Sequence, residues 1–362
     1  MIKKAIKSMY IRYKRRKVQK TYKRILLNNI SQLKINGCRK NGSKNNILKK
    51  YKINDATSDL FSNYYASILG INSEKFISVP TYFNYIEPKL NISSFAECLA
   101  DKNYYNRFFP DINTPTTFLR KIRGHFYDDT YNHINLSEQS FEVFTDSAPT
   151  IIIKASIDSG SGRNIEFYNL KNDQYENAVT KKPLTISYLE SFPDFIVQEF
   201  VVQHEFFRKF NPDSNNTVRV LIYRSVKDDS IHILHRLFRV GAKGSYLDHD
   251  NLGGVAIGIT TGHRLNRFAT DAIGNKYYEY NNIKLGEVGV VPFMDKIEEM
   301  ARTIAGQSFY ARLLAIDFTI DDRGNPLLIE INTQGNGTSQ YQMNNGPLFG
   351  EFTDEILEFC MK

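Results

Sequence analysis

The stretch LLAIDFTIDDRGNPLLIEINTQGNG, residues 313–337, carries the strongest local structural signal in the chain. Two apolar runs flank the segment DDRGNP at 321–326, whose Asp, Gly, Asn and Pro residues are typical of a tight turn. Apolar runs of strand length on both sides of such a turn predict a β-hairpin.

The turn sets which residues of this hairpin face each other. With the turn centred between Arg323 and Gly324, Asp317 lies directly opposite Glu330, and the Cβ atoms of such pairs are about 4.5–5.5 Å apart. Asn332 is two residues beyond Glu330 and therefore projects from the same face. Two carboxylates and an amide are expected on one side of an otherwise apolar hairpin.

Two carboxylates this close repel each other, unless one holds a proton or a cation lies between them. Asp317, Glu330 and Asn332 offer only oxygen ligands, which suit a magnesium ion that keeps waters and shares nucleotide phosphates. The pairing therefore predicts a magnesium site. The alternative is an edge hairpin whose carboxylates face solvent and bind no metal.

The chain has 362 residues and a net charge of +8 that is unevenly distributed. Residues 1–50 contain no Asp or Glu, and the first acid is Asp55, so a basic arm precedes a mildly acidic body. No apolar run approaches the roughly 18–20 residues that span a bilayer, and no secretory signal is recognised. Cys38, Cys98 and Cys360 are far apart and odd in number, which favours reduced thiols and a cytoplasmic protein.

The basic arm, residues 1–50, begins with rough helical spacing of apolar and basic residues at 2–31. Its irregular apolar stripe would comprise Ile6, Met9, Tyr10, Tyr13, Tyr22, Ile25 and Leu26. Such a helix can bind an anionic membrane, peripherally at its inner face, or an acidic polymer. The alternative is a helix that packs its stripe on the body. Nucleic acid is not expected, because no other signature supports it. Residues 35–50, rich in Asn, Gly, Ser and Lys, predict a loop or linker.

The remaining chain changes from a helical to a β-like pattern near residue 111. Residues 51–110 predict a helical region, and two β-rich lobes are predicted at 111–196 and 197–362. The predicted strands are 116–122, 150–155, 165–168, 195–201, 218–222, 231–238, 311–320 and 327–331, with a helix at 294–307. The predicted fold class is therefore α+β.

A second candidate site follows the apolar strand that ends at Lys154. Beyond it, Ser159, Gly160, Ser161 and Gly162 form a loop of small residues. Small residues let backbone N–H groups approach a phosphate, and a lysine adds a point charge. Each signal is weak alone, because SGSG is more often a surface turn and a lysine at a strand end often reaches solvent.

In their order along the chain, these motifs resemble the ATP-grasp superfamily. FIVQEFV at 195–201 looks like the hinge strand between the two lobes, and LIEIN at 328–332 looks like the metal-binding end. Further segments resemble the sugar-transfer-associated ATP-grasp family, related to the alpha-L-glutamate ligases. They are NPDSNNTVRV at 211–220, LFRVG at 237–241, DHDNLGG at 248–254 and the region 340–346, within a resemblance that covers 111–355.

The resemblance implies that ATP and Mg²⁺ lie between the two lobes. Its magnesium ligands carry over to Asp317, Glu330 and Asn332, and its phosphate contacts to Lys154 and the loop at 159–162. The adenine contacts carry over to Gln198, Glu199, Phe200 and Val201, and the ribose contact to His204 or Glu205. A second phosphate-binding cation falls on Arg120, Lys121 or Arg123, of which Arg120 is preferred. The Lys–Pro pair usual in the family is Lys154–Ala155 here, which leaves the phosphate contact in place.

The resemblance also implies ligation of a carboxylate to an amine through an acyl phosphate. Arg219 and Arg239 would steady the acyl phosphate and the tetrahedral oxyanion, although each could instead form a structural ion pair. The family context suggests an amino acid or amine joined to a sugar acid in surface polysaccharide biosynthesis. The alternatives are an ATP-dependent kinase with a hydroxyl acceptor and a non-catalytic nucleotide- or glycan-binding module.

Overall fold

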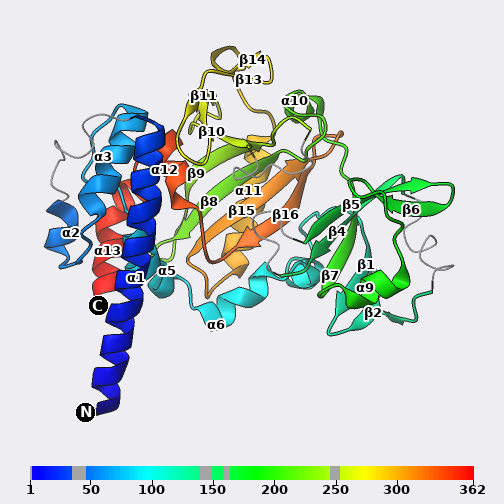
Figure 1. Ribbon diagram of the computed structural model, residues 1–362, viewed down its shortest axis with the longest axis horizontal. Coiled ribbons are helices and arrows are strands. Elements are labelled where there is room, and N and C mark those ends of the chain that lie inside the picture. Colours follow the sequence, from blue (N-terminus) through cyan, green and yellow to red (C-terminus); the bar gives the residue numbers. More distant parts are fainter. Residues whose placement is uncertain (1, 35–45, 138–147, 158–163, 245–252) are drawn as a thin grey trace.

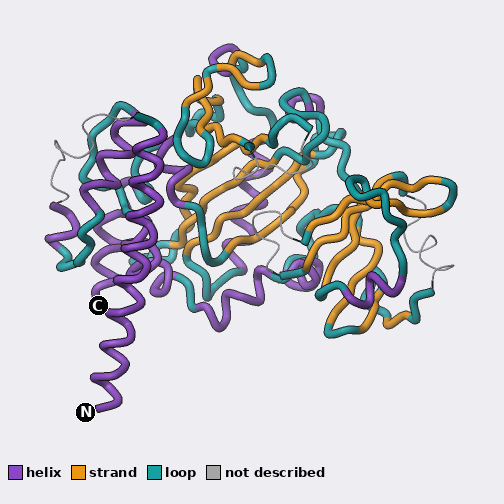
Figure 2. Tube along the Cα trace, viewed as in Figure 1, coloured by secondary structure: helices purple, strands orange, loops and turns teal. Residues whose placement is uncertain are grey.

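The computed structural model of the chain describes residues 2–34, 46–137, 148–157, 164–244 and 253–362. Two seven-stranded antiparallel sheets lie side by side, and a layer of helices packs against one of them (Figures 1 and 2). The helical N-terminal region followed by two β-rich lobes confirms the predicted α+β class.

The first sheet lies at the right of Figure 1 and has the strand order β3-β2-β1-β7-β4-β5-β6. Its strands are β1 (Thr117–Ile122), β2 (His125–Tyr127), β3 (His133–Ile134), β4 (Thr150–Ala155), β5 (Ile165–Lys171), β6 (Gln174–Asn177) and β7 (Phe195–Glu199). Helix α9 (Ile186–Ser191) covers one face, where Leu119, Ile153 and Leu189 form part of a buried apolar cluster. The opposite face carries the residues of the candidate site.

The second sheet has the strand order β12-β11-β10-β9-β8-β15-β16. Its strands are β8 (Thr217–Arg224), β9 (Ile231–Val240), β10 (Val255–Ile259), β11 (Leu265–Thr270), β12 (Lys276–Tyr277), β15 (Leu313–Ile320) and β16 (Pro326–Asn332), and β13 (Glu279–Tyr280) pairs separately with β14 (Ile283–Lys284). Helix α11 (Met294–Gln307) packs Ile297, Ala301 and Ile304 on one face. The earlier helices of the N-terminal region, α12 (Thr338–Asn345) and α13 (Thr353–Met361) pack on the other, whereas Ala96 and Tyr105 belong to the cluster of α11.

The N-terminal part of the chain is helical, as predicted. It contains α1 (Ile2–Gln32), α2 (Asn46–Lys50), α3 (Ser58–Leu69), α4 (Val79–Thr81), the π-helical η1 (Tyr82–Ile86), α5 (Glu87–Leu90), α6 (Ser93–Ala96), the 3-10 turns η2 (Glu97–Ala100) and η3 (Lys102–Tyr104), and α7 (Tyr105–Phe108). The prediction of a linker over 35–50 is wrong at its end, because Ile47 and Leu48 of α2 are buried in the apolar cluster that they share with α12 and α13. Residues 35–45 lie outside the described residues.

Helix α1 does not form the single apolar stripe that the sequence predicts. Leu26 and Ile30 are buried, and Tyr22 stacks on Phe83 of the body, with 5.6 Å between the ring centroids. In contrast, Met9, Tyr10, Tyr13 and Ile25 are exposed. The start of the helix extends beyond the body (Figure 1), and the Arg15 guanidinium lies over the Tyr85 ring of the body, 4.0 Å from its centre. Over the described residues, no helix is both long enough and apolar enough to cross a bilayer.

All eight predicted strands occur, with ends that differ by at most three residues, and the helix at 294–307 matches α11 at both ends. The sequence analysis missed β2, β3, β6 and β10–β14. Apart from β10 and β11, these strands have two to four residues. Such short strands depend on their neighbours for stability, so their own composition signals them poorly.

The hairpin of β15 and β16 pairs Asp317 with Glu330, as predicted, but the strand register next to the turn differs from the predicted one. The pairs nearest the turn are centred on Arg323 itself rather than between Arg323 and Gly324. A β-bulge inserts Ile329 and shifts the register by one residue, which restores the Asp317–Glu330 pair.

Residues 200–204 connect the two sheets. The Phe200 N–H donates to the Thr150 carbonyl of the first sheet at 3.2 Å, and the His204 N–H donates to the Ile320 carbonyl of the second sheet at 3.0 Å. The chain therefore crosses between sheets within five residues of the end of β7. The exact limits of the predicted domains stay a prediction.

Buried Asn91, at the end of α5, ties the helical region to the second sheet. Its Nδ2 donates to the carbonyls of Leu313 and Thr333, and its Oδ1 accepts the Leu313 N–H at 3.0 Å. These bonds hold the start of β15 and the chain after β16 against the helices that carry part of the candidate site.

We expect Asn91→Ala to lower the free energy of unfolding by about 1–3 kcal/mol, because it leaves buried backbone groups unpaired. Urea denaturation of the full chain measures this loss. Exposed Asn72→Ala is the control and should change stability by less than about 0.5 kcal/mol. Equal losses in the two variants would contradict the structural role of Asn91.

Candidate active site

Adjacent strands bring the predicted charged residues of the second sheet onto one face. Asp317 of β15 pairs directly with Arg219 of β8 and with Glu330 of β16. Arg239 of β9 pairs with Thr217, which lies two residues before Arg219. Because paired residues and alternate residues share a face, the four charged side chains project to the same side.

The Arg219 guanidinium binds the Asp317 carboxylate with two hydrogen bonds, from Nε to Oδ1 at 2.6 Å and from Nη2 to Oδ2 at 2.5 Å. Arg239 Nη1 lies 3.5 Å from the same Oδ2. Burial acts to lower the pKa of Arg219, but the Asp317 charge outweighs it and raises that pKa well above its ordinary value. Asn332 Nδ2 lies 3.4 Å from Asp317 Oδ2. The structure therefore brings Arg219, Arg239, Asp317 and Asn332 together.

The sequence analysis missed Lys102, which binds the second predicted metal ligand. Its Nζ lies 2.8 Å from Glu330 Oε1, and the lysine side chain is only 5% exposed. Burial acts to raise the pKa of Glu330, but Lys102 outweighs this effect, with smaller contributions from Arg219 and Arg239, and lowers the pKa to about 2. Lys102 is 228 residues from Glu330 in the chain, so no local pattern could have joined them.

On the first sheet, pairing across β1, β7 and β4 places the three candidate cations differently. Arg120 pairs with Ile196, which pairs with Lys154, so Arg120 and Lys154 share a face. Lys121 projects to the opposite face, where its ammonium donates to three backbone carbonyls at the end of α9. Arg123 lies in the turn after β1 with φ +52°. The geometry therefore agrees with the preference for Arg120.

The Arg120 side chain is fully buried and already has protein partners. Its Nη2 donates to Asn106 Oδ1 at 2.6 Å, its Nη1 donates to the Asn103 carbonyl at 3.2 Å, and its guanidinium lies 4.5 Å from the centre of the Tyr131 ring. Burial lowers the pKa of Arg120. These contacts fix its position beneath the site, and a direct contact with ATP stays a prediction.

Lys154 is buried at the end of β4 on the same face. Burial and the nearby positive charge of Lys102 lower the pKa of Lys154 to about 8, although Glu330 acts in the opposite direction. A buried lysine near a second buried lysine is costly while no anion lies between them. The loop at 159–162 that follows falls outside the described residues.

The structure separates the residues predicted to contact adenine. Gln198 pairs with Ile152 and lies on the face of Lys154, where its Nε2 donates to Thr117 Oγ1 at 3.2 Å. Glu199 lies on the opposite face, where its Oε1 accepts the N–H and hydroxyl of Thr116 at 2.9 and 2.8 Å. The structure turns the Glu199 carboxylate away from Lys154, so its side chain does not join the other site residues.

The remaining predicted contacts lie along the connection between the sheets. The Phe200 ring meets Phe167 edge-on at 6.3 Å between centroids, and Val201 is buried. His204 Nδ1 accepts the Phe206 N–H and caps α10 (Glu205–Arg208), while Glu205 is exposed in its first turn. Neither His204 nor Glu205 contacts a described residue of the charged cluster. The ribose contact therefore stays a prediction.

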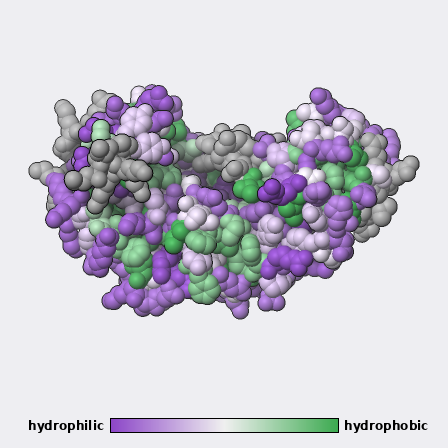
Figure 3. Space-filling view, turned by 90° about the horizontal axis from the view of Figure 1, so that it is seen from below, coloured by the Kyte–Doolittle hydropathy of each residue, from purple (hydrophilic) through white to green (hydrophobic). Residues whose placement is uncertain are grey.

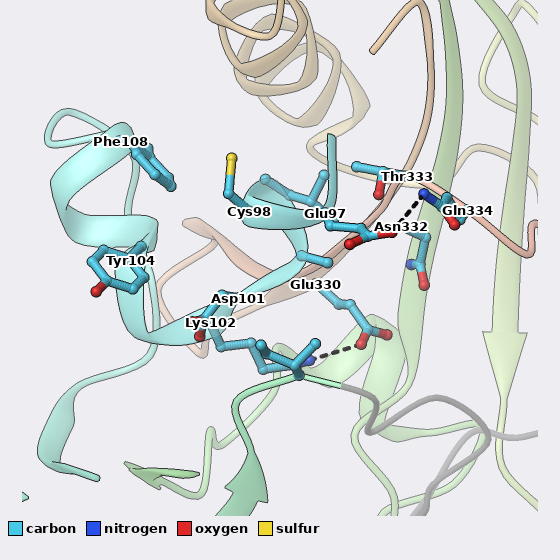
Figure 4. Close-up of a pocket in the computed structure, with 13 residues that line it drawn as sticks. Glu97, Cys98, Asp101, Lys102, Tyr104, Phe108, Glu330, Asn332, Thr333 and Gln334 are labelled. Atoms are coloured by element: carbon cyan, nitrogen blue, oxygen red, sulfur yellow. Dashed lines mark hydrogen bonds and ion pairs between the residues drawn. The ribbon is translucent and has the colours of Figure 1, made fainter. Parts of the chain in front are cut away.

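A cavity of about 680 Å³ adjoins the charged cluster (Figure 4). Its lining comes from three places: the helical segment from η2 to α7, the end of β16 with the residues after it, and Ile157 beyond β4. The Lys102–Glu330 ion pair lines this cavity, and the rings of Tyr104 and Phe108 lie along another side of it. The cavity therefore joins both lobes and the helical region.

The residues fit a magnesium ion that is coordinated partly by the protein and partly by the phosphates of a nucleotide. Asp317, Glu330 and Asn332 supply two carboxylates and an amide, all of them oxygen ligands. Among the described residues, no group of three or more His, Cys, Asp or Glu side chains could hold a metal alone. A metal here therefore needs further ligands from phosphates and water, which is the usual coordination of magnesium in nucleotide sites.

The model of the sugar-transfer associated ATP-grasp family matches residues 82–356, about three quarters of the chain. This protein belongs to that family. The match confirms the predicted resemblance and fold class, and it begins early enough to include Lys102. A search of the curated proteins found no match.

The chain is similar to solved structures at low sequence identity and low TM-score. The ATP-grasp ligase PsnB, in a complex with a variant precursor, Mg and ADP, is 11% identical, with a TM-score of 0.41 over 75% of this chain and 61% of that chain. The D-alanine–D-alanine ligase from Bacillus anthracis is 12% identical, with a TM-score of 0.39 over 74% of this chain and 67% of that one. The chain thus spans about three fifths of the PsnB length.

We expect Lys154→Met to stabilise the nucleotide-free protein at pH 7. The folded protein holds the pKa of Lys154 at about 8, below the ordinary value of 10.5, so the charged lysine opposes folding below pH 8. Removing it should raise the free energy of unfolding by at most about 3 kcal/mol, because each pKa unit corresponds to about 1.4 kcal/mol.

The gain should shrink as the pH rises from about 8 to 10.5, because the wild-type lysine then becomes neutral in the folded state first. Urea denaturation at several pH values measures the difference. Lys171→Met, at an exposed lysine of β5, is the matched control. A pH-independent difference between Lys154→Met and wild type would contradict the assignment.

Proposed function

We propose that this ATP-grasp protein is an ATP-dependent carboxylate–amine ligase that works through an acyl phosphate with Mg²⁺. The observation that carries the proposal is one charged cluster built from both sheets and the helical region. Lys102, Lys154, Arg219 and Arg239 supply four cations, while Asp317 and Glu330 supply two carboxylates. The buried site therefore has an excess of two positive charges, which suits a polyphosphate that arrives with a divalent cation.

Each group has a role in this reaction. Asp317, Glu330 and Asn332 would hold magnesium, which supplies charge neutralisation at the β- and γ-phosphates. Lys154 would bind a phosphate from the first sheet. The substrate carboxylate takes the γ-phosphoryl group of ATP and becomes an acyl phosphate, and the amine then displaces phosphate and loses a proton. Arg219 and Arg239 would steady the negative charge that develops on the acyl oxygen.

The face of the first sheet that carries Lys154 also offers a place for the base. Ile152 and Phe167 are buried there in a small apolar cluster, with Ile165 and Phe200 packed against them. A flat aromatic base can lie on such a surface while its edge reaches polar backbone groups. Gln198, on the same face, is the polar side chain best placed for that edge.

The cavity beside Glu330 would receive the acceptor. Glu97 and Asp101 line it, and their carboxylates attract an amine, while Tyr104 and Phe108 offer ring faces for a cation or a sugar. A sugar acid as the carboxylate and a role in surface polysaccharide biosynthesis would suit a member of a sugar-transfer associated family. The alternatives are phosphoryl transfer to a hydroxyl and binding without turnover.

The test measures ADP and phosphate release from Mg²⁺-ATP, with pools of amino acids, amines and uronic acids added singly and in pairs. Release that needs both an acid and an amine, with a product that weighs one water less than their sum, would support the ligase. A phosphorylated product without free phosphate would select the kinase. ATP binding without turnover under any pair would select the binding module.

We expect Glu330→Gln to reduce Mg²⁺-dependent ADP release by on the order of 100-fold or more, because it removes a charged metal ligand while the strand pairing stays. Glu299→Gln, at an exposed position of α11, is the control and should retain activity. A melting curve shows that the fold survives. Near wild-type activity in Glu330→Gln would refute the metal assignment.

We also propose that α1 holds the protein at an anionic membrane surface. Arg12, Arg16 and Lys20 are exposed and spaced by four residues, so they form one row along the helix. A second feature is an exposed apolar patch of Ile92, Phe95, Phe309 and Tyr310, in which Phe95 and Tyr310 stack at 4.4 Å.

The start of α1 and the part of the body that carries Phe95 lie on the same side of the molecule. The start of α1 and helix α6, which carries Phe95, both lie toward the lower edge of Figure 1. Figure 3, seen from below, shows apolar side chains gathered over the middle of this face. Exposed aromatic groups next to a basic helix favour the interface of an anionic bilayer.

Replacing Arg12, Arg16 and Lys20 with Gln should weaken binding to phosphatidylglycerol vesicles by on the order of 100-fold, since each basic residue contributes about 1 kcal/mol. Co-sedimentation at low and high salt measures this binding, with phosphatidylcholine vesicles as the neutral surface. Enzyme activity should not change. Equal binding of variant and wild type would remove this role of the arm and leave the packing alternative.

A further inference from the structure

Lys102 is an unusual lysine, because it is buried and forms an ion pair with a predicted metal ligand. Its side chain is 5% exposed, and its Nζ lies 2.8 Å from Glu330 Oε1. Lysine is rarely buried unless its charge is paired. The position of the ammonium at that carboxylate oxygen is one that a metal ion bound to Glu330 would also need.

Two hydrogen bonds hold the backbone around Lys102 in place. The Lys102 N–H donates to the Ser156 carbonyl just after β4, at 3.0 Å, and Asp101 Oδ1 accepts the Asn103 N–H at 3.0 Å and caps η3. Lys102 therefore starts from a fixed point beside the first sheet, and its side chain reaches across to the second (Figure 4).

The side chain itself can change partners. A lysine ammonium is a point charge on a flexible four-carbon stem, whereas Arg219 holds Asp317 through a planar, two-bond contact between adjacent strands. Lys102 also lies close enough to Lys154 for the two positive charges to repel. An anionic phosphate bound at Lys154 would attract Lys102 away from Glu330.

We propose that Lys102 is a positioning residue that keeps divalent cations off Glu330 until nucleotide phosphates bind. This proposal rests on the proposed function of the same site. Without nucleotide, a metal ion must displace the ammonium from Glu330 and then lie near Lys102 and Lys154, which repel it. With nucleotide, the phosphates give Lys102 another anionic partner and supply ligands for the metal. Metal and nucleotide therefore bind together rather than in sequence.

The test measures Mn²⁺ binding to the full chain without nucleotide, from the loss of the free Mn²⁺ signal in electron paramagnetic resonance. Wild type should bind weakly at this site. Lys102→Met, which keeps the length and removes the charge, should bind Mn²⁺ at least about tenfold more tightly, within the range of coupling between linked sites. Lys102→Arg should restore the weak binding, and Lys171→Met on β5 should match wild type.

The same titration with ADP present gives the second measurement. ADP should tighten Mn²⁺ binding in wild type, and Lys102→Met should lose most of this coupling. Lys102→Gln, a second neutral variant, replaces Lys102→Met if a melting curve shows that the latter does not fold. If neutral variants bind Mn²⁺ without ADP as weakly as wild type does, while ADP still promotes binding, the role of Lys102 is overturned. If Mn²⁺ fails to bind to wild type even with ADP, the metal site of the proposed function fails.

Discussion

The bidentate pair of Arg219 and Asp317 is the interaction on which the arrangement of the site depends. It joins β8 to β15, which lies next to the edge strand β16 of the second sheet, and the carboxylate is almost completely buried. Breaking such a pair leaves a buried charge without its partner, which is costly, so the surrounding side chains are arranged to keep it. Arg239 and Asn332 approach the same carboxylate, and Glu330 is held opposite it by the β-bulge.

The cluster as a whole has more positive than negative charge, and most of its side chains are buried. Lys102 and Lys154 repel each other. Burial and this repulsion together lower the pKa of Lys154. A protein selected for stability alone would not keep two such lysines together. An excess of buried positive charge is understandable where an anion binds, because the ligand then supplies the missing partners. The cost of burying these lysines and their affinity for phosphate have the same origin.

The site also depends on three parts of the chain that are remote in sequence. The first sheet contributes Lys154 and Gln198, the second sheet contributes the carboxylates, and η3 contributes Lys102. Asn91 fixes the helical region to the start of β15 and to the chain after β16, and the Lys102 N–H donates to the Ser156 carbonyl beside the first sheet. The helical region is therefore part of the site rather than an appendage to it.

The sequence by itself determined the local elements and the chemistry within each of them. Turn residues between two apolar runs identified the hairpin, and alternation along its strands put Asp317, Glu330 and Asn332 on one face. The family motifs, read in order, identified the fold. These signals are visible because hairpins and strands are made of residues close together in the chain.

Only the tertiary structure decided which remote groups meet. It placed Lys102 on Glu330, put Arg120 and Lys121 on opposite faces of β1, and turned the Glu199 carboxylate toward Thr116. It also left Met9, Tyr10 and Tyr13 of α1 exposed, where the sequence predicted one irregular apolar stripe. Each of these outcomes depends on sheet register or on packing between distant segments, and neither is encoded in the spacing of neighbouring residues.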